Sequence, residues 1–219
     1  MSLNLDQARF NMVEQQVRTW EVLDPRVLDV LRDVPREDFV PSRYRKLAFA
    51  DLRIPLAQGQ VMMKPLEEGR VLQALAIEPG QRVLEIGTGS GFLAVCLAAL
   101  GADVVTVDIH AELADSAQSR LSRLGIEGVT VHTGDALGEF SPEGQFDAVV
   151  VTASAAEVPD RFKAWVRPQG RLVAVRGMSP AMETVCLVHT DGDRWRADSL
   201  FETDLPRLIG AEDRPHFDF

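Results

Sequence analysis

The segment from Val83 to Gly91 brings together an apolar strand pattern, an acid and three alternating glycines. It reads VLEIGTGSG, so a glycine stands at every second position of the turn that follows the strand. Glycine lacks a Cβ, and its backbone can therefore reach left-handed conformations and present N–H groups directly to a ligand. The pattern predicts a site for a nucleotide-like cofactor. The residues expected to bind it here are Glu85, Gly87, Thr88, Gly89, Ser90 and Gly91.

The spacing of these glycines distinguishes between two kinds of cofactor. A dinucleotide fingerprint has glycine at its first, third and sixth positions. Counted from Gly87, the sixth position is Phe92, so the turn follows the pattern GxGxG. With Glu85 two residues before the first glycine, the segment resembles the opening motif E/D-x-G-x-G-x-G of class I methyltransferases. The motif therefore favours S-adenosylmethionine over NAD, and a nicotinamide-dependent oxidoreductase is the rival enzyme class.

A second acid follows the next predicted strand. The stretch ADVVTVD reads as a strand that closes on Asp108, seventeen residues beyond Gly91. A carboxylate at the end of the second strand of a doubly wound sheet can accept hydrogen bonds from both hydroxyls of a ribose. We therefore expect Asp108 and the adjacent Ile109 to contact the cofactor. The alternative is an ordinary acid at a strand end.

Two further strand ends supply the remaining expected cofactor contacts. GVTVHTGDA reads as a third strand with Asp135 and Ala136 at its end, where class I methyltransferases commonly place groups near the adenine amine. Asp135 is alternatively an N-cap for the following segment, since Asp is among the preferred caps. FDAVVVTAS reads as a fourth strand that begins after Asp147 and ends at Thr152, which we also expect at the cofactor.

These motifs need a scaffold that gathers strand ends at one edge. The apolar stretch FLAVCLAALG reads as a buried helix after the glycine turn, and RPQGRLVAVRG supplies a turn and a fifth strand. Strands thus alternate with helical stretches, which predicts an α/β, Rossmann-like, doubly wound and mainly parallel sheet. Such sheets bind ligands just beyond the carboxyl ends of their strands, where every motif named above falls.

Composition limits the classes of function. The chain of 219 residues carries a formal net charge of −10, with a pI near 4.9. No nucleic-acid partner is expected, because phosphate recognition relies on clustered Lys and Arg. The longest apolar run is far shorter than the ~20 residues that span a bilayer, so we expect no membrane partner and a cytoplasmic location. The scattered histidines, with Cys96 and Cys186 as reduced core thiols, predict no metal site.

The first 65 residues resemble the amino-terminal region of protein-L-isoaspartate O-methyltransferases. The resemblance rests on MVEQQVR, DPRVLDVLRDVPREDFVP and AFAD…PLAQGQ, and it continues through EPGQRVLEIGTGSGF, FDAVVVTAS and RPQGRLV. It implies a seven-stranded sheet with an antiparallel closing strand, an N-terminal helical lobe with the acceptor loop at 1–66, and a cofactor-binding methyltransferase domain at 67–219. It also implies S-adenosylmethionine as methyl donor and carboxyl O-methylation of L-isoaspartyl residues in damaged proteins or peptides, which is a repair reaction.

The loop before the sheet departs from the pattern of that family. Family members usually carry a threonine, an apolar residue, a serine, a glutamine and a proline, and the hydroxyls help to form the acceptor site. Here the loop reads Val61, Met62, Met63, Lys64 and Pro65. In one interpretation, backbone N–H groups and Lys64 hold the acceptor carboxylate, with Met63 at the serine position. In a second the pocket suits a more apolar acceptor, and in a third Met62 and Met63 simply pack into the core.

The amino-terminal helices and their charges have expected roles of their own. Apolar residues at helical spacing, such as Val27, Leu28, Val30 and Leu31, are expected to pack across the strand ends and cover the cofactor. The charges of PREDF are expected at the surface. The altered acceptor loop also leaves open a protein that binds S-adenosylmethionine without transferring its methyl group.

Overall fold

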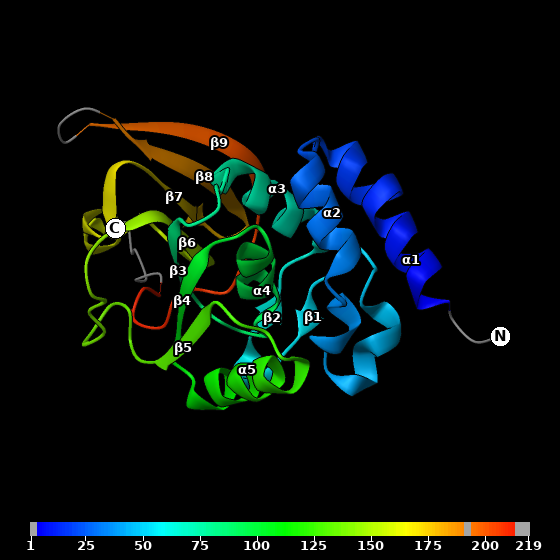
Figure 1. Cartoon of the computed structure of the whole chain (residues 1–219). Coiled ribbons are helices and arrows are strands. Elements are labelled where there is room, and N and C mark those ends of the chain that lie inside the picture. The colour runs from blue at the N-terminus through cyan, green and yellow to red at the C-terminus, as the bar shows by residue number, and fades with distance from the viewer. Residues whose placement is uncertain (1–3, 191–193, 213–219) are drawn as a thin grey trace, which may run out of the picture.

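Seven strands form one sheet in the order β5-β4-β3-β6-β7-β8-β9 in the computed structural model, which describes residues 4–190 and 194–212 (Figure 1). The strand bounds are β3 Arg82–Ile86, β4 Asp103–Asp108, β5 Val129–Thr133, β6 Phe146–Ala155, β7 Val166–Met178, β8 Ala181–His189 and β9 Trp195–Thr203. Strands β3 to β7 pair in parallel, and β8 runs antiparallel between β7 and β9. The expected mainly parallel, seven-stranded sheet is confirmed, with β8 as its antiparallel strand.

The fourth sheet strand is longer than the sequence suggested. The prediction ended it at Thr152, but β6 continues to Ala155. The extension arises from pairing with β7, in which Ser154 and Ala155 lie opposite Val175 and Arg176 after a register shift. Ser154 also bonds a segment that returns after β9. Its N–H donates to the Pro206 carbonyl at 2.8 Å, and its own carbonyl accepts from the Leu208 N–H at 2.8 Å. A contact between residues so distant in sequence leaves no local pattern, so the prediction was wrong at this end.

The segments before the sheet are mostly helical. Their bounds, with those of the remaining helices, are α1 Leu5–Met12, a π turn Val13–Val17, α2 Pro25–Asp33, β1 Ile54–Pro55, β2 Val61–Met62, α3 Pro65–Leu75, α4 Phe92–Ala99, α5 Ala111–Leu124 and α6 Asp160–Ala164. Helix α2 begins where the Asp24 carboxylate accepts from the Arg26 N–H at 2.9 Å and Pro25 fills the first helical position. Short 3-10 turns at Arg18–Trp20, Arg36–Asp38, Ser42–Leu47 and Ala57–Gly59 complete the lobe.

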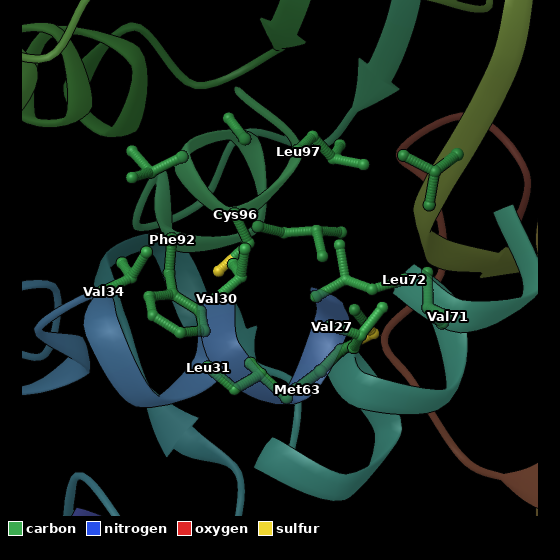
Figure 2. Packing of buried hydrophobic residues seen from close by; sticks show 14 of the residues in the cluster. Val27, Val30, Leu31, Val34, Met63, Val71, Leu72, Phe92, Cys96 and Leu97 are labelled. Atoms are coloured by element: carbon green, nitrogen blue, oxygen red, sulfur yellow. The ribbon is translucent and has the colours of Figure 1, made fainter. Parts of the chain in front are cut away.

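The apolar face of α2 packs against other helices. Figure 2 shows Val27, Val30 and Leu31 of α2 facing Leu72 of α3 and Phe92 of α4 in one buried cluster. No residue of α2 lies among the described residues that line the main cavity. The expectation that these residues cover the cofactor was therefore wrong. An apolar stripe shows that a helix packs against other elements, but it does not identify those elements.

The core has two parts, one on each face of the sheet. The larger cluster joins α2, α3 and α4 to one face, and the smaller one places Phe146, Phe162 and Val166 on the other. The proposed boundary between residues 66 and 67 falls in the first turn of α3, and the division into 1–66 and 67–219 stays a prediction. Cys96 and Cys186 are both buried free thiols.

The structure also bears on membranes and metals. Within 4–190 and 194–212, no helix is long and apolar enough to cross a bilayer. The same residues contain no group of three or more His, Cys, Asp or Glu side chains arranged to hold a metal ion. His216, one of the scattered histidines, lies outside the described residues.

Candidate active site

A cavity opens at the carboxyl ends of β3, β4 and β6, where the parallel arrangement gathers the strand ends at one edge. Its empty volume is about 860 Å³, with space open to solvent included. Most residues predicted to bind the cofactor or the acceptor line it. They are Met63, Glu85, Gly87, Thr88, Gly89, Ser90, Asp108, Ile109, Asp135, Ala136 and Thr152. The structure does not bring Gly91 and Lys64 into this lining.

The glycine turn has no space for a side chain at its first position. Gly87 has φ +98°, and a Cβ added there would lie 2.3 Å from the Thr152 Oγ1. That hydroxyl donates to the Gly87 carbonyl at 2.7 Å and so fixes the turn to the end of β6. Gly91 lies at the start of α4 with φ +83°, and its Cβ would meet Ala117 of α5 at 3.3 Å. The two glycines therefore serve different needs: Gly87 shapes the cavity wall, and Gly91 lets α4 and α5 approach.

Asp108 is held by the backbone on both of its oxygens. Its Oδ2 accepts from the Gly89 N–H at 2.9 Å, and its Oδ1 accepts from the His110 N–H at 2.9 Å. The side chain is buried yet lines the cavity. Each carboxylate oxygen has two lone pairs, so both keep the capacity to accept one more hydrogen bond. The geometry fits a ligand that offers a pair of hydroxyls, as predicted for a ribose.

Glu85 ends a buried chain of hydrogen bonds. Its Oε2 accepts from the Thr106 hydroxyl at 2.6 Å, and that hydroxyl lies 2.7 Å from the hydroxyl of Thr88. Burial raises the pKa of Glu85 to about 8; the hydrogen bond from Thr106 opposes this shift, and the nearby carboxyls of Asp108 and Glu68 contribute to it. At neutral pH Glu85 is therefore protonated, which limits the negative charge beside the glycine turn.

Asp135 builds the turn after β5 and also lies in the lining of the cavity. Its Oδ1 accepts from the Leu137 N–H at 2.8 Å, and its carbonyl accepts from the Gly138 and Phe140 N–H groups, both at 3.0 Å. These bonds build the turn after β5, as a capping residue would. Asp135 and the buried Ala136 also line the cavity, so a role beside an adenine stays a prediction.

The acceptor loop is apolar and buried where it meets the cavity. Met62 and Met63 are only 4% and 6% exposed, and both belong to the core cluster as well as to the cavity lining. Figure 2 shows Met63 within that cluster. Lys64 points elsewhere: its Nζ lies 3.8 Å from an Asp51 oxygen, and its N–H donates to Glu67 at 3.0 Å. The packing of both methionines fits the third interpretation, and their place at the cavity keeps the second open.

A buried arginine that sequence reasoning placed at the surface holds this loop. Arg36 has no exposed area, and its Nη2 donates to the Met63 carbonyl at 2.8 Å. Its Nε donates to the Ala48 carbonyl at 2.9 Å, and its Nη1 contacts the Glu68 carboxyl. Glu37 beside it is also buried, so the expectation of surface charges in PREDF was wrong for these two residues. A guanidinium can be buried when carbonyls and a carboxyl satisfy its fork of donors.

Sequence reasoning missed one wall of the cavity. Arg207, Leu208 and Ile209, beyond β9, line it together with Leu56 and Gln60 of the segment before the acceptor loop. Arg207 forms an isolated parallel bridge with Ser154. No periodicity marks residues 205–209, because their position depends on the end of β6 and not on a pattern of their own.

The fold and the cavity define a class I S-adenosylmethionine-dependent methyltransferase. The residues present fit that cofactor, because the Gly87 position leaves no room for a Cβ and a fixed carboxylate follows the second strand. A family model described as "Protein-L-isoaspartate(D-aspartate) O-methyltransferase (PCMT)" matches residues 7–193. The chain belongs to this family of methyltransferases, as the resemblance predicted.

Individual relatives agree with the family assignment. The chain is similar to "Protein-L-isoaspartate O-methyltransferase 1" of Rhodopseudomonas palustris, with 38% identity over 93% of this chain and 84% of the relative. It is 36% identical to a protein-L-isoaspartate O-methyltransferase of Koribacter versatilis, over 95% and 92% of the two chains. A crystal structure of a putative protein-L-isoaspartate O-methyltransferase from Plasmodium falciparum, in complex with S-adenosyl-L-homocysteine, has a TM-score of 0.77 at 19% identity. It covers 91% of this chain and 97% of that one, and it supports the fold.

Proposed function

We propose that this chain transfers a methyl group from S-adenosylmethionine to the free carboxylate of an L-isoaspartyl residue in a damaged protein or peptide. One observation carries the proposal: in a member of this family, a backbone-held Asp108 and a Cβ-free turn at Gly87 line one cavity. The cytoplasmic location and the absence of nucleic-acid and membrane partners stay predictions from the sequence.

Each part of the cavity has a role in this proposal. The backbone of the glycine turn would border the methionyl part of the donor, Asp108 would accept the ribose hydroxyls, and Asp135 with Ala136 would border the adenine. When bound, S-adenosylmethionine supplies a methyl group already activated by its sulfonium. The acceptor carboxylate is ionised at neutral pH, so no side chain of this protein needs to remove a proton. The work of the protein is to orient the acceptor and to exclude water, which the buried Met62 and Met63 favour.

The direct test uses a matched pair of peptides. The purified protein is incubated with methyl-labelled S-adenosylmethionine and a peptide containing a single isoaspartate, beside its normal aspartyl twin. We expect label on the isoaspartyl peptide alone, released by mild base as an ester. Absence of label on that peptide, while calorimetry shows that the donor binds, would refute isoaspartyl methylation. Loss of donor binding in Asp108→Ala supports the ribose role, and unchanged affinity removes Asp108 from the site.

A second candidate function has one observation in its favour. Val61 and Met63 present apolar groups where family members usually have hydroxyls, and both line the cavity together with Met62. A methyltransferase of the same fold with a more apolar acceptor, or a protein that binds the donor without transfer, would carry such a lining. Donor binding without label on any isoaspartyl peptide would favour one of these two.

A further inference from the structure

The 3-10 turn Ser42–Leu47 concentrates positive charge in an acidic protein. Three of its six residues are Arg43, Arg45 and Lys46, and no acid occurs in residues 39–50. The chain as a whole has a formal net charge of −10. The field of the whole molecule therefore repels an acidic partner, whereas this turn attracts one locally.

Two charges of this turn are not neutralised by the protein itself. The side chains of Arg43 and Lys46 are exposed, and in the described part of the chain neither forms an ion pair or a hydrogen bond. Arg45 differs from them, because its Nη2 lies 2.8 Å from an Asp38 carboxylate oxygen. Arg43 and Lys46 are therefore the two cations of the turn that are available to a partner.

The turn is anchored to the body of the protein. The guanidinium of Arg43 lies over the ring of Tyr44, 4.7 Å from its centroid, as in a cation–π contact. Tyr44 is partly buried and packs against the larger core cluster. At the end of the turn, the Ala48 N–H donates to the Arg45 carbonyl at 3.4 Å. The free charges thus belong to a surface whose backbone is held in place.

This surface adjoins the acceptor loop. The Arg36 guanidinium donates to the Ala48 carbonyl at 2.9 Å and to the Met63 carbonyl at 2.8 Å, so one side chain holds the residue after the turn and a residue of the cavity lining. Figure 1 shows the segment that follows α2, in light blue, beside β1. A polypeptide spans at most ~3.3–3.6 Å per residue. With its acceptor in the cavity, a few of its neighbouring residues reach this surface.

We propose that the turn Ser42–Leu47 is a docking surface for an acidic segment of the polypeptide substrate, which it binds through Arg43 and Lys46. The inference rests on the proposed function of isoaspartyl methylation and adds a preference for isoaspartates that have acidic neighbours. Guanidinium and ammonium groups donate charge-assisted hydrogen bonds to carboxylates. Exposed ion pairs are individually weak and screened by salt, so the preference should be moderate and should depend on ionic strength. Two free cations contact too few phosphates to hold a nucleic acid in an acidic protein.

The test compares three isoaspartyl peptides that differ only in their flanking residues. One carries three glutamates before the isoaspartate, one carries them after it, and the third has glutamine at all six positions. At low ionic strength, wild type should have a KM about 3–10-fold lower for one of the glutamate peptides than for the glutamine peptide. The double variant Arg43→Gln, Lys46→Gln should lose this ratio and keep the KM of the glutamine peptide. In ~1 M salt, where the Debye length is about 3 Å, wild type should lose it as well.

A matched variant separates a docking surface from a general effect of charge. Arg123→Gln with Arg196→Gln removes the same charge from exposed positions on α5 and β9, and it should leave the peptide ratio unchanged. An equal loss in this control would refute a local surface. Transfer by wild type without preference for either glutamate peptide refutes the inference alone.

Two further outcomes identify a different error. If wild type binds a single-stranded oligonucleotide, the double variant does not, and the peptide ratio is the same in both, the turn serves nucleic acid and the proposal is overturned. No transfer by wild type to any of the three peptides refutes the proposed function, and the inference falls with it.

Discussion

Replacing Glu85 with glutamine should make the protein more stable than wild type, and increasingly so as the pH rises. In the folded protein burial raises the pKa of Glu85 to about 8 from its ordinary value of 4.5. Between these values the unfolded chain has released the proton and the folded one retains it, so the free energy of unfolding falls as pH rises. Each pH unit costs about 1.36 kcal/mol for one such proton. The substituted glutamine would not titrate, and it keeps the size of the side chain and the acceptor for Thr106.

The magnitude follows from the pH window. From about pH 5.5 to 7.5, the stability advantage of Glu85→Gln over wild type should grow by about 2.5 kcal/mol and then level off above about pH 8. Urea unfolding of the ligand-free proteins at several pH values measures this difference. Glu68, whose pKa is also raised to about 8, is present in both proteins, and because its carboxyl acts on Glu85 the difference between the two curves includes their interaction.

An exposed acid outside the cavity provides the control for this measurement. Glu143→Gln exchanges an exposed acid on the loop before β6 and serves as the matched control for the loss of one carboxyl group. Parallel stability curves for wild type and Glu85→Gln would show that Glu85 has already lost its proton in the folded protein. At pH 7 both proteins should bind S-adenosylhomocysteine equally, because position 85 is neutral in each.

Three other variants test the cavity and the residues that support it. Gly87→Ala places a Cβ 2.3 Å from the Thr152 hydroxyl at φ +98°, so calorimetry should detect no donor binding, and normal affinity would show that the turn can move aside. Arg36→Met leaves the buried Glu68 carboxyl and the Ala48 and Met63 carbonyls without their donor and should lower the unfolding free energy by about 3–5 kcal/mol, against a loss under about 1 kcal/mol if these bonds are dispensable. Val61→Thr with Met63→Ser restores the hydroxyls usual in the family and should raise the rate of isoaspartyl methylation, whereas an unchanged rate would mean that the loop does not limit acceptor binding.

The features that the sequence predicted best are those whose cause is local. The apolar residues before Gly87 indicate a strand, and a glycine at every second position indicates a turn whose backbone takes left-handed conformations. Asp108 followed from the same logic one strand later. In each case a few adjacent residues carry both the structure and the expected chemistry, so the sheet and its edge could be predicted without any long-range contact.

The features that escaped prediction depend on contacts between distant segments. Arg36 lies in a charged stretch, and nothing near it in sequence shows that Ala48 and Met63 carbonyls will satisfy it in the core. The apolar stripe of α2 fits several partners, and only the fold selects α3 and α4 over the strand ends. Arg207 reaches the cavity through Ser154, which lies far earlier in the chain.

The apolar acceptor loop decides what an acceptor needs in order to bind. Val61 and Met63 stand where family members usually carry hydroxyls, and the nearly buried Met62 and Met63 exclude water and lower the local dielectric. The cost of desolvating an acceptor carboxylate in such surroundings is offset only if hydrogen-bond donors contact it directly. The loop side chains offer no such donor, so backbone N–H groups or side chains from elsewhere in the cavity must supply it.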